Sequence, residues 1–335
     1  MLTDTFITMD HGSGGVKTSQ LIEELMVPAF SNPQLCALGD GAILPPAGGN
    51  LAFSTDSFVI DPLEFPGGDI GHLCVCGTAN DLAMCGARPM WLSLSMILEE
   101  GFPVETLKRI IASIARTASL EGITIATGDT KVVEKGKGDG IYINTAGIGL
   151  VEEPGLSPDR ITPGDRVIIS GTLGDHSTAI MVARNDLGIC ADLKSDCMPL
   201  YRLAKAAWTC GGVKVLRDAT RGGLATTLNE FTENRSFGII LEQGALPIKP
   251  EVKTVCGLLG LDPLYCANEG KMVSIVSADK ADEVLKAIKS VPGGENAAII
   301  GTVTGDYAGK VILKNRLGAM RIMPKLTGAM LPRIC

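Results

Sequence analysis

Residues 51–100 read LAFSTDSFVIDPLEFPGGDIGHLCVCGTANDLAMCGARPMWLSLSMILEE, and this stretch decides the fold. Its first and last ten residues are apolar runs with the length and composition of β-strands. Residues 69–84 lie between them and have the pattern of a helix rich in small residues. A strand, a helix and a second strand in succession indicate an α/β fold.

The segment at residues 103–122 predicts an amphipathic helix. Pro103 falls in its first turn, where the fixed backbone angle of proline is tolerated, and Gly122 gives a stop signal. The predicted apolar face consists of Val104, Leu107, Ile111, Ile114 and Ala118.

The rest of the chain repeats this alternation in two halves. Strand patterns at residues 122–129 and 140–151 are followed by residues 152–165, whose three prolines mark a domain boundary. The second half has strand patterns at residues 166–171, 238–242, 271–277, 297–304 and 310–315, and helix patterns at residues 176–186, 222–234 and 280–290. We therefore expect mixed α/β sheets in two domains, residues 1–155 and 160–322, and a flexible tail of residues 323–335.

The composition excludes several classes of protein. The 335 residues are 45% hydrophobic and 20% charged, which suits two globular domains with sizeable cores. A net charge of −7 without a run of Lys or Arg argues against binding to nucleic acid. No apolar run reaches the roughly 18 residues of a membrane helix, and the first residues lack the layout of a signal peptide, so we expect a cytoplasmic protein without membrane contact.

The ten cysteines are expected to be reduced, and most of them to be small buried side chains. Cys74 and Cys76 form a C-x-C pair, but no second pair follows at zinc-finger spacing. This spacing argues against a structural metal site.

Four aspartates follow apolar runs or lie beside small residues, namely Asp40, Asp56, Asp81 and Asp129. A buried carboxylate is costly unless a positive charge meets it. Because Mg²⁺ prefers carboxylate ligands and completes its shell with water and phosphate oxygens, the four together indicate a magnesium site. For any single aspartate, a role as a helix cap or turn former is the alternative.

Two glycine-rich segments offer backbone N–H groups to phosphate, HGSGG at residues 11–15 and RDATRGG at residues 217–223. Neither matches the Walker A or the Rossmann pattern, so each is a weak signal alone. Lys131 follows a TGDT turn, where a cation can neutralise phosphate charge, and Glu269 precedes an apolar strand, where it can act as a base. Ordinary surface roles are the alternative for both.

Cys335 is the last residue of the sequence. An incidental exposed cysteine and a working thiol both agree with this position, because terminal residues are seldom part of a core. The twelve residues from Pro324 to Cys335 span about 40 Å when extended, so the thiol can reach a site on its own chain.

These motifs together resemble the HypE family, the carbamoyl dehydratases of NiFe-hydrogenase maturation. The resemblance runs in order from about residue 10 to residue 335. It rests on HGSGG, FSTDSFVIDPLEFPGGDIG, GTANDLAMCGARP, ILEEG, TGDTKVV, SGTLGDH, RDATRGG, ANEGK and the final PRIC.

The family resemblance implies a two-domain fold like that of aminoimidazole ribonucleotide synthetase, a homodimer formed through the N-terminal sheets, and ATP with Mg²⁺ near the cleft. It also implies a reaction on the tail. The carbamoyltransferase HypF would load a carbamoyl group onto the thiol, and ATP-dependent dehydration would convert this thiocarboxamide to a thiocyanate. The cyano group would then pass to iron held by HypC and HypD.

The resemblance further implies roles for single residues. Cys335 would carry the group, Glu269 would be the base, and Lys131 would assist at the reacting oxygen. The Mg²⁺ ligands would be Asp40, Asp56, Asp81 and Asp129. The nucleotide contacts would come from Gly12, Ser13, Gly14, Gly15, Asn80, Thr130, Asp218 and Arg221.

Other functions make different predictions. A small-molecule kinase or synthetase of the same ATP-binding superfamily would use ATP without Cys335. A non-enzymatic carrier would use the tail without turning over ATP. A redox role is disfavoured because the sequence has no C-x-x-C motif.

Overall fold

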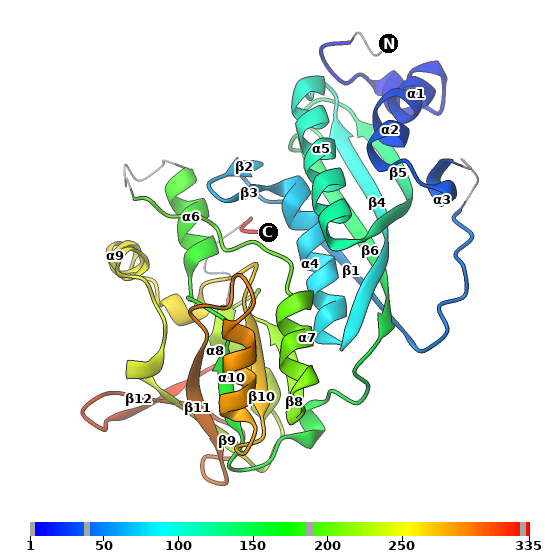
Figure 1. Ribbon diagram of the computed structural model, residues 1–335. Helices are drawn as coiled ribbons and strands as arrows, with labels where there is room; N and C mark the ends of the chain where they lie inside the picture. Colours follow the sequence, from blue (N-terminus) through cyan, green and yellow to red (C-terminus); the bar gives the residue numbers. More distant parts are fainter. Residues whose placement is uncertain (1–3, 37–40, 185–190, 329–332) are drawn as a thin grey trace.

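The structure is a computed structural model that describes residues 4–36, 41–184, 191–328 and 333–335. Two large sheets with separate helical layers lie side by side, and the last residues of the chain lie between them (Figure 1). The mixed α/β fold expected from the sequence is confirmed. The domain limits themselves stay a prediction.

The first sheet has four strands in the order β1-β6-β4-β5. Its pairs are antiparallel except for the parallel pair of β4 and β5. Two helices, α4 and α5, cover one face of this sheet (Figure 1). The bounds are β1 Leu51–Phe58, β2 Glu64–Phe65, β3 Gly68–Asp69, α4 Ile70–Met84, β4 Ala87–Glu99, α5 Val104–Glu121, β5 Thr124–Val133 and β6 Ile141–Val151.

Short helical turns precede this sheet along the chain and pack beside β5. They are η1 Met9–Gly12, α1 Val16–Leu21, η2 Ile22–Met26, α2 Val27–Phe30 and α3 Pro33–Cys36.

The second sheet has seven strands in the order β13-β12-β9-β11-β7-β10-β8. Its strands are β7 Arg166–Ile169, β8 Val213–Asp218, β9 Gly238–Glu242, β10 Met272–Val276, β11 Ala298–Thr304, β12 Val311–Lys314 and β13 Met320–Met323. The helices of this half are η3 Pro158–Arg160, α6 Asp175–Ala183, α7 Tyr201–Thr209, α8 Gly223–Thr232, η4 Gln243–Ala245, α9 Pro250–Leu259, η5 Pro263–Tyr265 and α10 Ala281–Lys289.

The amphipathic helix predicted at residues 103–122 is confirmed as α5. Pro103 is its N-cap, and Gly122 ends it in the left-handed conformation at φ +67°. The predicted apolar face is buried, with exposures of 0–3% for Val104, Leu107, Ile111, Ile114 and Ala118. The elements that were not predicted include α1–α3, β2 and β3 in the first half and β8, α7, α9 and β13 in the second. In β13 three of the four residues are exposed, so that strand has no buried alternation to detect.

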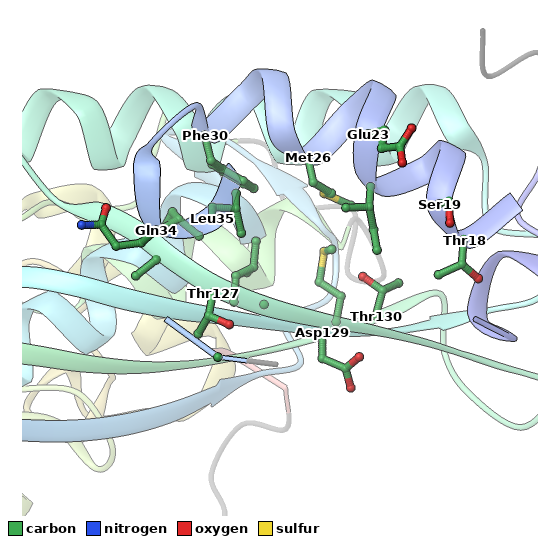
Figure 2. Close-up of a pocket in the computed structure, with 17 residues that line it drawn as sticks. Thr18, Ser19, Glu23, Met26, Phe30, Gln34, Leu35, Thr127, Asp129 and Thr130 are labelled. Carbon is green, nitrogen blue, oxygen red and sulfur yellow. The ribbon is translucent and has the colours of Figure 1, made fainter. Parts of the chain in front are cut away.

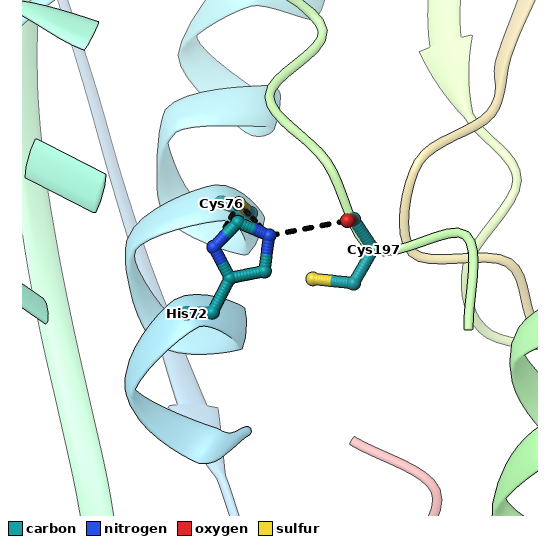
Figure 3. Close-up of side chains that lie close together, drawn as sticks. All are labelled: His72, Cys76 and Cys197. Atoms are coloured by element: carbon teal, nitrogen blue, oxygen red, sulfur yellow. Dashed lines mark hydrogen bonds between the residues drawn. The ribbon is translucent and has the colours of Figure 1, made fainter. Parts of the chain in front are cut away.

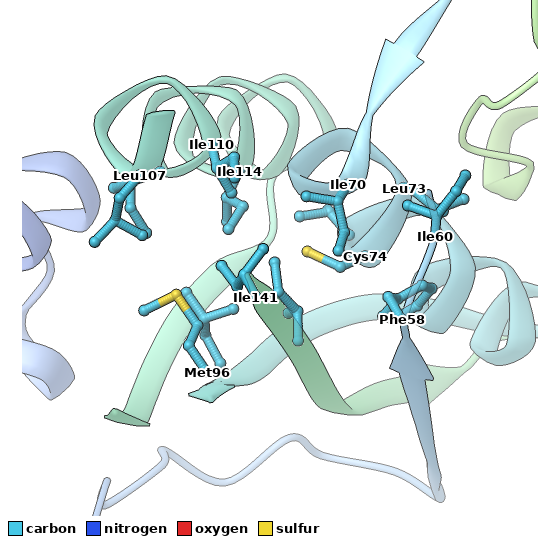
Figure 4. Packing of buried hydrophobic residues seen from close by; sticks show 14 of the residues in the cluster. Phe58, Ile60, Ile70, Leu73, Cys74, Met96, Leu107, Ile110, Ile114 and Ile141 are labelled. Atoms are coloured by element: carbon cyan, nitrogen blue, oxygen red, sulfur yellow. The ribbon is translucent and has the colours of Figure 1, made fainter. Parts of the chain in front are cut away.

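The core of the first half lies between its sheet and the two helices (Figure 4). Phe58, Leu73, Ile110 and Ile141 interlock there, and each is at most 1% exposed. Ile334, from the last residues of the chain, belongs to the same apolar cluster and is 6% exposed. The docked end of the chain is therefore packed into the core, not laid over the surface.

The other face of the first sheet is open and carries large apolar side chains. Leu51, Phe53 and Ile97 are 54%, 71% and 43% exposed. Single exposed apolar residues are common, but several on one sheet face indicate an interaction surface.

Among the described residues, no helix is both long and apolar enough to cross a bilayer. No disulfide joins the cysteines in the described ranges, and five of them are buried, as expected for reduced thiols.

Candidate active site

Three aspartates from separate elements come together beside α4 and β8. Asp56 lies on β1, Asp81 in the last turn of α4, and Asp218 at the end of β8. The packing of α4 against β1 requires a small residue at Gly77, where an added Cβ would lie 2.8 Å from the ring of Phe58. The small residues noted in this helix thus allow Asp81 to approach Asp56.

The three carboxyl groups resist ionisation. Burial is the main cause that raises the pKa of each, and charge repulsion from Asp56 adds to the rise at Asp81. At Asp218, burial and then repulsion from Asp81 raise the pKa to about 7. A set of hard oxygen donors whose charges oppose one another is the donor set that a divalent cation such as Mg²⁺ would stabilise.

Glu269 lies next to these aspartates and is 3% exposed. Burial raises its pKa well above the ordinary value, and repulsion from Asp218 and Asp196 adds to the rise. Without a cation nearby, burial and repulsion therefore make Glu269 harder to ionise than an exposed glutamate.

Arg221 provides positive charge to this cluster. Its Nη2 atom lies 3.1 Å from Oδ1 of Asp56. The turn that places it contains Gly222 at φ +72° and Gly223 at φ +59°. A Cβ on Gly223 would lie 2.5 Å from the carbonyl oxygen of Cys266, so the glycine-rich RDATRGG sequence is needed to make this turn.

The last three residues of the chain are docked beside Arg221. They border a cavity of about 420 Å³ that is also lined by Ser57, Val59, Ser177, Arg221, Tyr265 and Ala267. The N–H of Val59 donates to the carbonyl of Cys335 at 3.0 Å, and the N–H of Asp61 donates to the carbonyl of Arg333 at 3.4 Å. The Arg333 side chain donates to the Val59 carbonyl at 2.9 Å and pairs with Asp139.

The docked thiol of Cys335 is half-buried and close to both charged neighbours. Burial is the main cause that raises its pKa to about 11, and repulsion from Glu269 adds to the rise. Arg221, within hydrogen-bonding reach of the sulfur, opposes the rise. The pocket therefore favours an uncharged sulfur.

Asp129 and Lys131 lie elsewhere in the same chain. Both are on β5, with side chains 63% and 66% exposed and 3.9 Å apart. The register aligns Asp129 with Ser95, Asn144 and Ser57 across the sheet. Three strand spacings separate Asp129 from Ser57, or about 14 Å.

The two carboxylates also point to opposite faces of the sheet. Asp56 is one residue from Ser57 and faces α4, whereas Asp129 shares the open face with Ser57. Figure 2 shows Asp129 on the side of the sheet away from the helices that carry Met26 and Phe30. One chain alone therefore does not bring all the predicted metal ligands together.

The HGSGG loop packs against β5, the strand that carries Asp129. A Cβ on Gly12 would lie 2.5 Å from the backbone nitrogen of Val132, so the loop rests directly on β5. Gly14 has φ +80°, and Gly15 is the N-cap of α1. Ser13, the C-cap of η1, donates to the carbonyl of Asp10.

Thr130 lines a cavity of about 330 Å³ between α1–α3 and the helix-covered face of β4 and β5, and Asp129 borders the same cavity (Figure 2). Asp40 lies outside the described residues.

Asn80 binds residues 191–200, a segment that we call the strap. Its side-chain nitrogen donates to the carbonyl of Met198 at 3.1 Å, and its oxygen accepts from the N–H of Leu200 at 2.7 Å. Asn80 is 2% exposed, so in this structure it binds the strap to α4.

The strap also supports Glu269 and was not recognised from the sequence. Asp196 accepts from the N–H of Glu269 at 3.1 Å and forms a buried ion pair with Lys271 at 3.2 Å. A Cβ on Gly270 would lie 1.9 Å from the Asp196 carbonyl oxygen. Asp196 and Lys271 are charged residues beside apolar ones, which is a sequence signal for a buried ion pair. Nothing in the sequence places the two residues together.

A second contact of the strap joins His72, Cys76 and Cys197 (Figure 3). Their ligand atoms lie within 4.8 Å of one another. The Nε2 atom of His72 is 3.1 Å from the carbonyl oxygen of Cys197 and 3.6 Å from Sγ of Cys76. The C-x-C pair considered in the sequence is thus split, since only Cys76 takes part in this contact.

Comparison with known proteins adds to this geometry. The family profile "AIR synthase related protein, N-terminal domain" matches residues 38–151, and "AIR synthase related protein, C-terminal domain" matches residues 162–314. "Carbamoyl dehydratase HypE" of Rhodobacter capsulatus is 45% identical over 340 residues, which cover 100% of this chain and 99% of that protein. The chain belongs to the HypE family.

Solved structures of HypE proteins superpose closely on this one. HypE in complex with ATP has a TM-score of 0.93 at 45% identity and covers 98% of this chain and 99% of its own. The match to a HypE-HypF complex has a TM-score of 0.80 at 46% identity and covers 91% and 99% of the two chains. The two-domain HypE fold, with the architecture expected from the sequence, is therefore shown.

Proposed function

We propose that this protein catalyses the ATP-dependent dehydration of a carbamoyl group carried on Cys335. The product, a thiocyanate, supplies the cyanide ligand of iron during NiFe-hydrogenase maturation. The observation that carries the proposal is the docked thiol of Cys335, held beside Arg221 and the buried Glu269. A small-molecule kinase would have no use for a thiol in this position.

The proposed reaction balances as a phosphoryl transfer followed by an elimination. The carbamoyl oxygen of S–C(=O)–NH₂ attacks the γ-phosphorus of ATP, and ADP leaves. The C–O bond then breaks, phosphate departs with that oxygen, and the nitrogen loses both protons as C≡N forms. In a reaction of this kind the protein contributes mainly positioning and charge neutralisation.

Arg221 and Glu269 provide the chemistry at the sulfur end. Arg221 reaches the sulfur of Cys335 and can stabilise negative charge on the adjoining carbamoyl oxygen. Glu269 is the group placed to take protons from nitrogen. A lower pKa would make its carboxylate form more available as a base, and neutralising Asp218 and Asp56 would remove two causes of the rise.

Asp56, Asp81 and Asp218 are the residues that would hold Mg²⁺. The cation would neutralise the phosphates of ATP. Their raised pKa values fit this role, because each carboxyl gains from a positive neighbour. Asp218, which the sequence suggested as a nucleotide contact, lies within the acidic cluster and is proposed here as a metal ligand.

A homodimer would explain why Asp129 and Lys131 lie apart from this cluster. Leu51, Phe53 and Ile97 expose apolar surface on the face that carries Asp129. Pairing two open faces would bury this surface. Asp129 and Lys131 of each chain would then lie at the interface between the two chains.

HypF is the proposed source of the carbamoyl group, since a relative has been solved in a HypE-HypF complex. The thiol must leave its pocket for loading, because a pKa of about 11 leaves little thiolate at pH 7. A carbamoylated sulfur carries no such charge, so it returns to the pocket without the cost of burying a thiolate. HypC and HypD are the proposed recipients of the cyano group.

An oxygen-18 label in the carbamoyl group tests this function. Protein carbamoylated with labelled carbamoyl phosphate and HypF, then given Mg·ATP, should release inorganic phosphate that contains the label. Cys335→Ser should release none from a tail adduct. Phosphate without the label, whose oxygens come only from ATP and solvent, would mean simple ATP hydrolysis and would contradict the proposal.

A further inference from the structure

The docked tail is held by hydrogen bonds on two edges. The carbonyls of Arg333 and Cys335 face residues 59–61, as described above. The carbonyl of Ile334 points away from this pairing, into the buried interior. There it lies 2.7 Å from Nε2 of His176, whose side chain is fully buried.

The protonation of His176 follows from its two partners. A carbonyl oxygen can only accept, so Nε2 carries the proton that it donates to Ile334. In a neutral ring Nδ1 is then an acceptor, and the hydroxyl of Ser195 lies 2.7 Å away as its donor. The Ser195 oxygen in turn accepts from the N–H of Cys197 at 3.0 Å. Every proton in this chain of contacts has a partner, and burial lowers the pKa of His176, in agreement with a neutral ring.

The ring of His176 is fixed from both halves of the molecule. It stands at the start of α6, which follows Gly174 at φ +83°. The ring of Phe65, from β2, meets it edge-on at 5.7 Å and 87°. Ser195 on the strap holds the far nitrogen. The donor that meets Ile334 is therefore held in place before the tail arrives.

We propose that His176 is a positioning residue, whose Nε2–H holds the Ile334 carbonyl and so places the adjoining Cys335 sulfur between Arg221 and Glu269. This inference rests on the proposed function and adds a residue to it. The tail has to leave for loading and return for dehydration. The tail is also held by Val59, Asp61 and Arg184, and the hydrogen bond from His176 adds to these. It suits this exchange because it meets a backbone carbonyl and is available whichever group the sulfur carries.

The position of the tail can be measured without the dehydration reaction, from the rate at which iodoacetamide alkylates Cys335. His176→Leu keeps the approximate volume but removes the donor. His176→Gln keeps an N–H donor near the position of Nε2. His72→Leu is the matched control, because His72 also contacts a carbonyl of the strap, that of Cys197, but none of the tail.

We expect His176→Leu to alkylate about tenfold faster, the effect of losing one hydrogen bond to a buried group. Its dehydration of the carbamoylated tail should also slow, because the docked fraction falls and the sulfur of a docked tail is no longer fixed between Arg221 and Glu269. Loading by HypF, which uses the undocked tail, should be no slower than in the wild type, and His176→Gln should restore the rates of alkylation and dehydration. A ring with a merely structural role would impair loading and dehydration alike.

Three results would overturn the proposal. The first is wild-type rates of alkylation and dehydration in His176→Leu. The second is rates that change equally in His176→Leu and His176→Gln, and the third is the same change in His72→Leu. Failure of the proposed function gives a different pattern. In that case the wild type shows no dehydration, while His176→Leu still exposes the thiol and His176→Gln still protects it.

Discussion

Cys335 shows how a pocket selects the charge state of a sulfur atom. Burial and the negative neighbours Glu269 and Asp56 raise its pKa, whereas Arg221 lowers it. A thiol with a pKa of about 11 is protonated at neutral pH. Burying a sulfur that bears a neutral carbamoyl group in the same position costs little free energy, because no charge is buried.

Removing one negative neighbour should make the docked thiol more acidic. Glu269→Gln takes away the largest charge that raises the pKa of Cys335, so the thiolate fraction at pH 8 should grow. Alkylation of Cys335 should be severalfold faster, up to about tenfold if its pKa falls by one unit. The measurement is the alkylation rate across pH 7–10, with the exposed Glu251→Gln as control. A pH profile identical to that of the wild type would contradict this electrostatic account.

Asp218 makes the stability of the ligand-free protein depend on pH. Its folded pKa of about 7 lies above the ordinary value of 3.8, so the folded state holds its proton more tightly than the unfolded state. Asp218 therefore makes its full contribution to the free energy of unfolding below about pH 4, and this contribution is lost as the pH rises to about 7.

Asp218→Asn cannot ionise and escapes this loss. The Tm difference between variant and wild type should be more favourable to the variant at pH 8 than at pH 5, in the absence of Mg²⁺. Scanning calorimetry at the two pH values measures this difference, with the exposed Asp306→Asn as control. An equal difference at both pH values would show that Asp218 is not the titrating group.

At the scale of elements, α4 connects the core to the site. Asp69 caps the helix, its Oδ1 accepting from the N–H of His72 at 2.8 Å. Its Oδ2 accepts from the hydroxyl of Ser113 on α5 at 2.7 Å. One carboxylate thus fixes the start of the helix whose last turn carries Asp81.

Loss of this cap should destabilise the fold measurably. Asp69→Ala is expected to lower the free energy of unfolding by about 1–2 kcal/mol, the usual cost of losing an N-cap. Asp69→Asn keeps an acceptor oxygen and should lose less. Urea denaturation followed by circular dichroism compares the two, and an Ala variant as stable as the wild type would refute the capping role.

The elements were predictable where periodicity was strong. Helix α5 showed a complete apolar face, and β1 and β4 were apolar runs of strand length. The strap was not predictable, because it has no regular structure and its role depends on contacts with Asn80 and Glu269. Those contacts join residues more than 70 positions apart, which no local pattern reports.

At the scale of the whole molecule, the sequence motifs divide into two groups. Within a single chain, one cluster contains Asp56, Asp81, Asp218 and Glu269. Three of these had been assigned from the sequence, Asp56 and Asp81 to the magnesium site and Glu269 as the base. Asp129 sits across the sheet on the opposite face. Sequence spacing could not reveal this, because which face a strand residue occupies depends on register with its neighbours.

A charge on the open sheet face should separate a dimer. Phe53 is 71% exposed in the single chain. Phe53→Glu should therefore be monomeric where the wild type is dimeric, because burying a carboxylate in an apolar interface is costly. Light scattering coupled to size-exclusion chromatography gives the masses, with Leu317→Glu on an exposed turn as control. A monomeric wild type would contradict the proposed dimer.

The central claim is that dehydration takes place on the tail itself, and intact mass spectrometry tests it most directly. The protein is incubated with HypF, carbamoyl phosphate and ATP, and then with further Mg·ATP. The account predicts a carbamoyl adduct on Cys335 that then loses the mass of one water, and no adduct in Cys335→Ala. An adduct on Cys335 that persists unchanged while ATP is consumed would contradict it.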